Sequence, residues 1–245
     1  MDVKQVTDTL NFYIRPQTFP LALKLCQSES ELPERARRPL RDLGYQIALC
    51  QGEGLARRYG WTMAIGKEDQ CCAGGATAMG FLVRSGGQST RSEKALDFGK
   101  YSHLLIAPIQ SATFEPDVVV LYVNSAQAMR LVQAISPSVP GVAQAETPTP
   151  RQGISAIASG FQDCGDVVAR TTLSDECQFI LPSGGDRVFG GTQDDELIFA
   201  MPRSKIEAVL QGLENTHRAG FRYPIVTDLR HRPELPPFLQ MPKEA

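Results

Sequence analysis

The feature that most constrains the fold of this chain is a cysteine-to-double-glycine unit that occurs twice. In the first half Cys50 opens the segment Cys-Gln-Gly-Glu-Gly-Leu-Ala-Arg, and Cys72 directly precedes Ala-Gly-Gly. In the second half Cys164 opens Cys-Gly-Asp-Val-Val-Ala-Arg, and Ser183 directly precedes Gly-Gly. Each unit follows a proline-led apolar run. A duplication of this kind predicts two copies of one thiol-bearing loop that meet about a pseudo-twofold axis.

The length of 245 residues is sufficient for one large domain that buries roughly 70% of its unfolded surface. We expect a single domain, in which residues 84–100, rich in Gly and Ser, form the linker between the halves. The predicted divisions are repeat halves at about 15–83 and 101–201, a C-terminal helix at 203–214 and a proline-rich tail at 220–245.

Composition narrows the expected partners and location. The formal charge of −2 and the isoelectric point near 6.0 provide no basic field, so we expect no nucleic-acid partner. No apolar run approaches the ~18 residues that a membrane span needs. Six cysteines without a secretory signal indicate reduced thiols and a cytoplasmic protein. The sequence is compatible with a homo-oligomer and identifies neither a small-molecule substrate nor a redox partner.

Hydrophobic periodicity predicts an irregular alternation of helices and strands. The fold class expected from it is α/β or α+β, with two pseudo-symmetric halves, each strand–helix–strand–glycine turn, packed as one compact unit. The expected helices are 3–14, 43–59, 126–135, 161–170 and 203–214. The expected strands are 21–25, 61–65, 104–108, 118–123, 153–158 and 176–181, with a further hairpin from 187–189 and 197–201.

The cysteines are the first candidates for chemistry, because thiolates are the soft ligands of zinc, copper(I) and iron–sulfur clusters. Two ligands from each repeat would form a symmetric site of Cys50, Cys72, Cys164 and Ser183. Serine is a poor ligand for soft metals, so the second copy is either degenerate or leaves a three-thiolate site with an open position. The alternative is that the cysteines only fill the core, since the chain has no Cys-x-x-Cys motif.

The paired glycines are the second candidates. Backbone amides at Gly74–Gly75 and Gly184–Gly185 could bind an anion, with Arg187 as its counter-charge. Neither pair matches a nucleotide-binding motif. Tight turns that need a positive φ are the favoured interpretation of both pairs.

Other polar residues have simpler interpretations. Arg57 and Arg170, at matching places in the two repeats, are expected to form ion pairs near helix ends. The acidic run Asp194–Glu196 is expected to be a solvated hairpin turn. Cys71 and Cys177 could each replace the missing fourth thiolate. The histidines are too few and too scattered to predict a catalytic triad.

The same segments resemble DUF169, a family of bacterial and archaeal proteins also described as uncharacterised ArCR. The resemblance rests on several short segments and extends over about residues 5–214. Members of that family often carry cysteine at the position of Ser183, so the resemblance implies an incomplete four-cysteine site here. It also implies a prokaryotic, cytoplasmic protein and no established activity. The matching segments are Pro20-Leu-Ala-Leu-Lys-Leu, Cys50-Gln-Gly, Cys72-Ala-Gly-Gly, Met79-Gly-Phe, Leu105-Ile-Ala-Pro-Ile, Phe114-Glu-Pro-Asp-Val-Val-Val, Gln127-Ala-Met-Arg-Leu, Cys164, Gly185-Asp-Arg and Ala200-Met-Pro.

Together these observations predict a redox or metal-binding protein, with an iron–sulfur cluster as the preferred occupant and zinc as the second choice. The alternative function is a non-catalytic module that binds a small anionic ligand at the glycine turns. A third hypothesis, a cysteine-nucleophile enzyme that uses Cys72, lacks a histidine partner. The sequence leaves open whether the protein is an enzyme.

Overall fold

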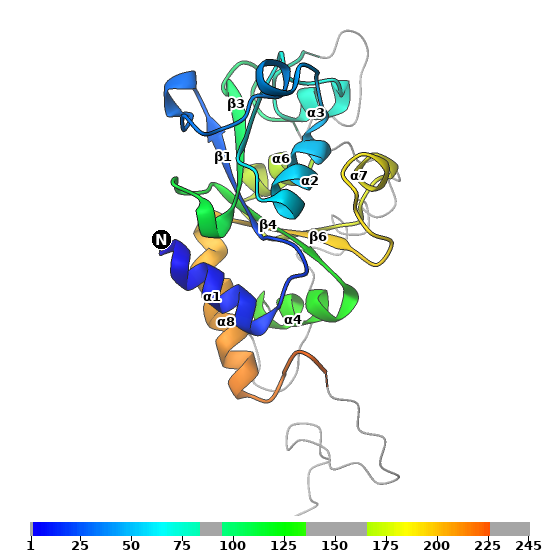
Figure 1. Cartoon of the computed structure of the whole chain (residues 1–245). Helices are drawn as coiled ribbons and strands as arrows, with labels where there is room; N and C mark the ends of the chain where they lie inside the picture. Colours follow the sequence, from blue (N-terminus) through cyan, green and yellow to red (C-terminus); the bar gives the residue numbers. More distant parts are fainter. Residues whose placement is uncertain (1, 84–94, 136–165, 226–245) are drawn as a thin grey trace, which may run out of the picture.

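The computed structural model describes residues 2–83, 95–135 and 166–225. In this part of the chain six strands form one antiparallel sheet with the order β2-β3-β1-β4-β6-β5, covered by helices on both faces (Figure 1). The strands are β1 (Leu21–Cys26), β2 (Met63–Gly66), β3 (His103–Pro108), β4 (Val118–Val123), β5 (Gln178–Ile180) and β6 (Leu197–Pro202). The helices are α1 (Val3–Tyr13), α2 (Leu49–Tyr59), α3 (Ala73–Ala78), α4 (Ser125–Ile135), α6 (Asp166–Ser174), α7 (Gly184–Val188) and α8 (Ile206–Arg218). Shorter helical turns occupy Glu29–Glu31, Pro39–Leu43, Ile109–Ser111 and Arg203–Lys205.

Strand β4 is apolar at every position because both faces of the sheet are covered. On one face Val118, Val120 and Tyr122 belong to the core that includes residues of α2, α3 and α6. On the other face the alternate residues of β4 contact a second core, formed with α1, α4 and α8. The molecule therefore has three layers, and each layer of helices has its own core.

Helix α2 is shorter than the sequence predicts and places Cys50 in its first turn rather than its middle. The predicted start near residue 43 is wrong because Gly44 adopts a left-handed conformation (φ 82°), which ends the turn Pro39–Leu43. The helix begins at Leu49, where the Gln51 side chain accepts a hydrogen bond from the Ala48 amide (2.8 Å). Its end at Gly60, with φ 75°, agrees with the prediction.

The glycine pairs do not form turns with positive φ. Gly74 and Gly75 lie in the first turn of α3, and Gly184 and Gly185 open α7. None of these four has a positive φ. The hairpin expected from 187–189 is also wrong, because these residues continue α7 and its C-cap, while β6 pairs with β4 and β5.

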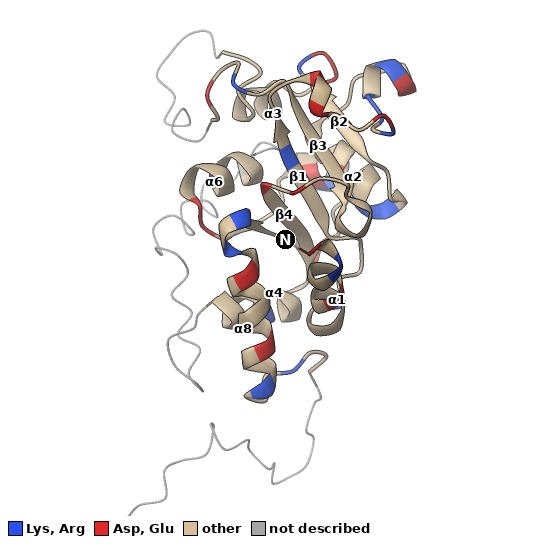
Figure 2. Ribbon diagram, turned by 90° about the vertical axis from the view of Figure 1, so that its left-hand side faces the viewer, with Lys and Arg blue, Asp and Glu red and all other residues tan. Residues whose placement is uncertain are grey.

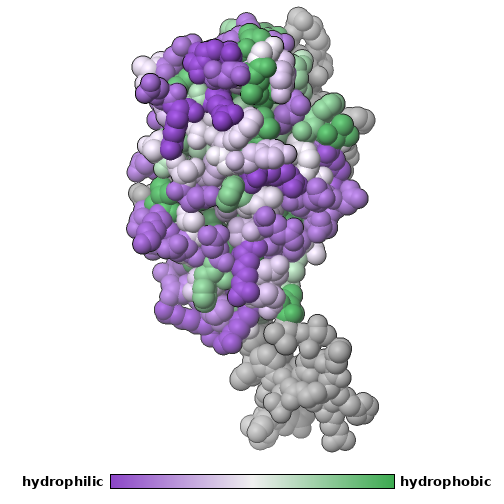
Figure 3. Space-filling model, viewed as in Figure 1, coloured by the Kyte–Doolittle hydropathy of each residue, from purple (hydrophilic) through white to green (hydrophobic). Residues whose placement is uncertain are grey.

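The mixed α and β class is confirmed, and the antiparallel sheet makes it α+β. The predicted strand at 153–158, most of the linker at 84–100 and the tail beyond residue 225 lie outside the described residues. Acidic and basic residues are interspersed along the ribbon in Figure 2, and the face in Figure 3 is mostly hydrophilic with small apolar patches. No helix of the described residues has the length and apolar character that a membrane crossing requires.

Candidate functional site

Two of the four predicted loops meet where the start of α2 contacts α7. The thiol of Cys50 donates a hydrogen bond to the carbonyl oxygen of Gly185, at 3.7 Å, across 135 positions of sequence. The Cys50 residue is 2% exposed. The α2–α7 contact therefore places the thiol of Cys50 against the glycine segment that opens α7.

This contact is close because glycines line it. A side chain at Gly190 would place its Cβ 2.7 Å from the Asp186 carbonyl oxygen and 2.9 Å from the Cys50 carbonyl oxygen. One turn further along α2, a Cβ at Gly54 would lie 2.7 Å from the carbonyl oxygen of Gly190. Backbone thus packs on backbone here, which accounts for Gly54, whereas Gly52 faces the side chains of Ile65 and Ile106.

Ser183 is the N-cap of α7, and its hydroxyl is occupied by that role. Its Oγ accepts a hydrogen bond from the Asp186 amide (3.2 Å) and donates one to Asp186 Oδ2 (2.8 Å). The Ser183 amide donates to the same carboxylate oxygen (2.8 Å). This capping box explains locally why serine is favoured at this position.

The remaining predicted site residues lie in different surroundings. Cys72 is the half-buried N-cap of α3, and the preceding Cys71 is exposed, with its amide bonded to Ile47 near the start of α2 (3.1 Å). Arg187 donates to the Gln193 carbonyl (2.6 Å) and faces Asp194 at 3.7 Å, so it is engaged by its own loop. Cys164 lies outside the described residues.

Two further thiols belong to other cores. Cys177 packs in the core on the opposite face of the sheet from α2, and burial raises its pKa to about 12. Cys26 is buried at the end of β1, and burial raises its pKa to about 11. Because Cys177 lies in the core on the other face of the sheet, it cannot serve as the fourth ligand next to Cys50.

A buried network of charged groups adjoins the Cys50 contact. The ion pair predicted for Arg57 near its helix end is confirmed, but the sequence did not predict its burial or the other members of the network. Arg57, 0% exposed, forms a bidentate ion pair with Glu196 (2.9 and 3.2 Å) and lies over the Tyr122 ring, 3.8 Å from its centroid. The Tyr122 hydroxyl donates to Glu53 Oε2 at 2.6 Å. The expectation that 194–196 form a solvated turn is wrong for Glu196, which is 4% exposed.

Burial dominates the electrostatics of this network. It raises the pKa of Glu53 to about 7, and the nearby Asp186 raises it further, while the Tyr122 hydrogen bond and Arg57 oppose the shift. Burial likewise raises the pKa of Asp186 and that of Tyr122, which rises well above its ordinary value. The interior next to Cys50 therefore holds a carboxyl group that takes up and releases a proton near neutral pH.

The profile of the DUF169 family, described as uncharacterised ArCR, matches residues 9–212 of the chain. The chain belongs to the DUF169 family. It is similar to the uncharacterised protein MJ0308 of Methanocaldococcus jannaschii, with 24% identity over 216 residues, which cover 80% of this chain and 86% of the relative. No solved structure matches the chain.

In this DUF169 protein, one face of α2 presents a thiol, a carboxyl group and a guanidinium. Cys50, Glu53 and Arg57 are spaced three and four residues apart, so they lie along one side of the helix. That spacing is the sequence signal that could have revealed Glu53 and Arg57 as inward-facing. A buried thiol, a carboxyl group with a pKa near 7 and a paired arginine together suit proton transfer or the binding of a charged group.

Proposed function

We propose that this DUF169 protein binds a metal through cysteines of two repeated loops, Cys50, Cys72 and Cys164, and serves a redox role. An iron–sulfur cluster is the preferred occupant and zinc the second choice. The observation that carries the proposal is the 3.7 Å contact between Cys50 Sγ and the Gly185 carbonyl, which brings segments of the two repeats together.

The order of strands in the sheet supports the proposed duplication. Read inward from one edge of the sheet the order is β2, β3, β1, and read inward from the other edge it is β5, β6, β4. The two orders agree when β1 is matched with β4, β2 with β5 and β3 with β6. Helices α2 and α3 then correspond to α6 and α7. In agreement with a twofold relation, α2 contacts α7 and α3 contacts α6. This correspondence assigns β3 to the first half, whereas the halves inferred from sequence, 15–83 and 101–201, place it in the second. The matched halves would meet where β1 pairs with β4.

Under this correspondence Cys50 matches Cys164 and Cys72 matches Ser183. Cys50 lies in the first turn of α2, and Cys72 and Ser183 are N-caps. The described part of α6 begins two positions after Cys164. Helix N-termini stabilise negative charge, including that of a thiolate or an anionic cluster. We propose that these helix starts converge to hold the metal.

The capping role of Ser183 favours a three-thiolate site over a four-ligand cage. Its hydroxyl hydrogen bonds with Asp186 would have to break before it could bind a metal. A site with three protein ligands keeps one coordination position for a water or substrate, as catalytic metal sites do. Glu53, with its pKa near 7, would be the acid–base group nearest to such a position along α2. Reduced thiols of this kind suit a cytoplasmic protein without a nucleic-acid or membrane partner.

The test is the content of iron, acid-labile sulfide and zinc after purification without oxygen. We expect iron and sulfide in similar amounts, lost in Cys50→Ala, Cys72→Ala and Cys164→Ala. Cys177→Ala is the matched control, because that thiol lies in the other core, and it should retain the metal. Equal metal content in all four variants, or none in the parent protein, would refute the proposal.

A groove on the outer side of the α2–α7 contact favours a second candidate, the small-ligand module. Its volume is about 210 Å³, and Gly190 and Gly191, Arg58 and the aromatic residues Tyr59 and Phe189 line it. The paired glycines proposed from sequence, Gly74–Gly75 and Gly184–Gly185, do not. This candidate predicts a metal-free protein whose thermal stability rises with an anionic aromatic ligand, an effect that Arg58→Gln weakens.

A further inference from the structure

The register of the sheet brings three strand ends together at one edge. Cys26 at the end of β1 pairs with His103 at the start of β3, and His103 pairs with Gly66 at the end of β2. The chain leaves β1 toward Glu29 and leaves β2 toward Glu68. The register alone therefore places two acidic turns on either side of one buried histidine.

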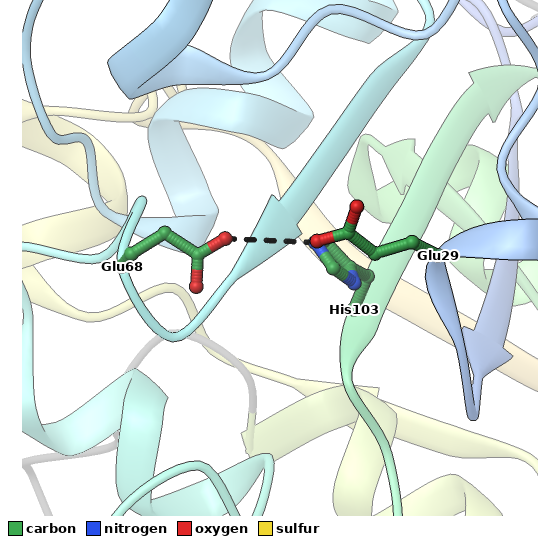
Figure 4. Close-up of side chains that lie close together, drawn as sticks. All are labelled: Glu29, Glu68 and His103. Atoms are coloured by element: carbon green, nitrogen blue, oxygen red, sulfur yellow. Dashed lines mark ion pairs between the residues drawn. The ribbon is translucent and has the colours of Figure 1, made fainter.

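Glu29, Glu68 and His103 form a cluster at this edge. One potential ligand atom from each residue lies within 4.8 Å of the other two (Figure 4). Both glutamates are exposed, whereas His103 is 3% exposed. The carboxylates thus face solvent and the imidazole forms the inner wall of the cluster.

One ring nitrogen of His103 forms a hydrogen bond, and the other has no hydrogen-bond partner in the part of the chain that the structure describes. Its Nδ1 is 3.0 Å from Ser102 Oγ, a contact that fixes the ring orientation. Its Nε2 is buried, has no hydrogen-bond partner among the described residues and lies 3.8 Å from Glu68 Oε1. A buried polar atom without a partner is costly, so this nitrogen indicates a missing ligand.

The absence of a side chain at Gly66 keeps space open at this nitrogen. A Cβ at Gly66 would lie 2.8 Å from His103 Nε2 and 3.1 Å from Glu68 Oε1. An alanine at this position would therefore clash with the imidazole and crowd the carboxylate. The glycine is an independent sign that the space between the imidazole and the carboxylate is required.

Arg38 is the resident cation of the cluster. Its guanidinium contacts Glu29 at 3.1 Å, forms an ion pair with Glu68 and lies 4.0 Å from the buried Asp69. Three carboxylates thus face one guanidinium. Asp69 is anchored separately by the amides of Leu40 and Gly66, both at 3.0 Å. The cluster keeps negative charge that a divalent cation would neutralise.

We propose that Glu29, Glu68 and His103 form a binding site for a divalent transition-metal ion such as zinc, and that Arg38 competes with the metal for the two glutamates. Imidazole nitrogen together with carboxylate oxygen suits zinc and its neighbours better than Mg²⁺ or Ca²⁺. Three protein ligands leave the fourth position for water. Burial, and then the charge of Arg38, lower the pKa of His103, while the neighbouring carboxylates oppose this shift.

Cobalt(II) titration of the whole chain tests this site apart from the cysteines. Thiolate ligation of Co²⁺ produces a sulfur-to-metal charge-transfer band, which nitrogen and oxygen ligands do not. We expect one equivalent of Co²⁺ to bind at this site without that band. Glu68→Gln and His103→Gln should each weaken the affinity for this Co²⁺ at least about tenfold, which corresponds to about 1.4 kcal/mol. Because Glu68 is exposed, its variant should fold normally even if His103→Gln does not.

Arg38 and Arg41 supply a matched pair of variants. Arg38→Gln should tighten the binding of this cobalt ion, because it removes the competing cation. Arg41→Gln, which removes an arginine that pairs with Asp42 and interacts more weakly with Glu29 and Asp69, should have a smaller effect, and Arg218→Gln on α8 should leave the affinity unchanged. Unchanged affinity in Glu68→Gln, or weaker binding in Arg38→Gln, would overturn the proposal.

Discussion

Arg57 on α2 and Glu196 before β6, 139 positions apart in the sequence, form a bidentate ion pair with both side chains almost completely buried. The Arg57 side chain is 0% exposed and that of Glu196 is 5% exposed. Arg57 also donates to the Gly191 carbonyl at 3.0 Å. The pair therefore fastens the loop 190–196 to the helix that carries Cys50.

Replacing one member of this pair should lower the free energy of unfolding more than replacing both members. Arg57→Met leaves Glu196 as a buried charge without its main partner, and we expect a loss of about 3–5 kcal/mol in the free energy of unfolding. The double variant Arg57→Met/Glu196→Leu should recover much of that loss. Urea unfolding measures each value, and additive losses would contradict a coupled pair.

The neighbouring Arg58 provides the control for that experiment. It lies 3.8 Å from Glu196, but its side chain is 32% exposed. Water screens such pairs, so Arg58→Gln should cost less than about 1 kcal/mol. An equal loss in the two arginine variants would show that burial does not decide the energy of the pair.

The free energy of unfolding should fall as pH rises through the weakly acidic range because of Glu53. This carboxyl titrates at its ordinary value of 4.5 in the unfolded chain and at about 7 in the folded protein. Between these values the folded state holds more protons, so stability decreases with rising pH by on the order of 3 kcal/mol and then levels off.

The variant Glu53→Gln isolates this effect, because its side chain cannot ionise. The difference in unfolding free energy between the parent protein and this variant should decline from about pH 4.5 to about pH 7. The pKa of Asp186 is also raised by burial, and to a first approximation its titration changes the unfolding free energy of both proteins by the same amount. A difference that stays constant over this range would mean that Glu53 keeps its ordinary pKa.

Alanine at Gly190 should loosen the contact between α2 and α7. The new Cβ would lie within 3 Å of two backbone carbonyl oxygens, those of Asp186 and Cys50, so backbone must shift. We expect a lower melting temperature and a loss of about 1–3 kcal/mol. The matched control is Gly184→Ala, where no atom lies within 4 Å, and it should be neutral or slightly stabilising. The opposite ranking in calorimetry would contradict the contact.

The thiols of the metal-free folded protein should react in order of exposure. Cys71 is exposed and Cys72 is half-buried, so both should be alkylated first. Cys26 and Cys177 should react only on unfolding, because burial also raises the pKa of each thiol, to about 11 and about 12. Timed labelling with mass spectrometry of the peptides measures the order, and early labelling of Cys177 would contradict its core position.

The elements with strong local patterns were predictable. The apolar run of β4 and the helix that ends at Gly60 follow from side-chain periodicity and from one glycine. The start of α2 was not predictable, because the segment from 43 to 48 is apolar enough to extend a helix pattern. Only the left-handed Gly44 ends the preceding turn. Local propensity therefore located most elements but missed this boundary.

The buried charges were harder to predict than the elements. Glu53, Arg57 and Glu196 are residue types that normally face water, and their partners come from distant parts of the sequence. The short-range signal was the alignment of Glu53 and Arg57 with Cys50 on one side of α2. His103 shows the same limit, because its acidic neighbours join it only through the register of three strands. Sequence periodicity cannot supply such pairings.

The Arg57–Glu196 ion pair also sets the order in which the protein can fold during synthesis. As the ribosome releases the first half, α2 presents Arg57 and Glu53 on the side that must enter the core. The counter-charge of Arg57 and the closing loop come from residues 190–196, which emerge more than a hundred positions later, and the hydrogen-bond partner of Glu53 is Tyr122. The central strand β1 likewise waits for β3 and β4. The nascent first half is therefore held short of its native core until nearly all of the domain has left the exit tunnel.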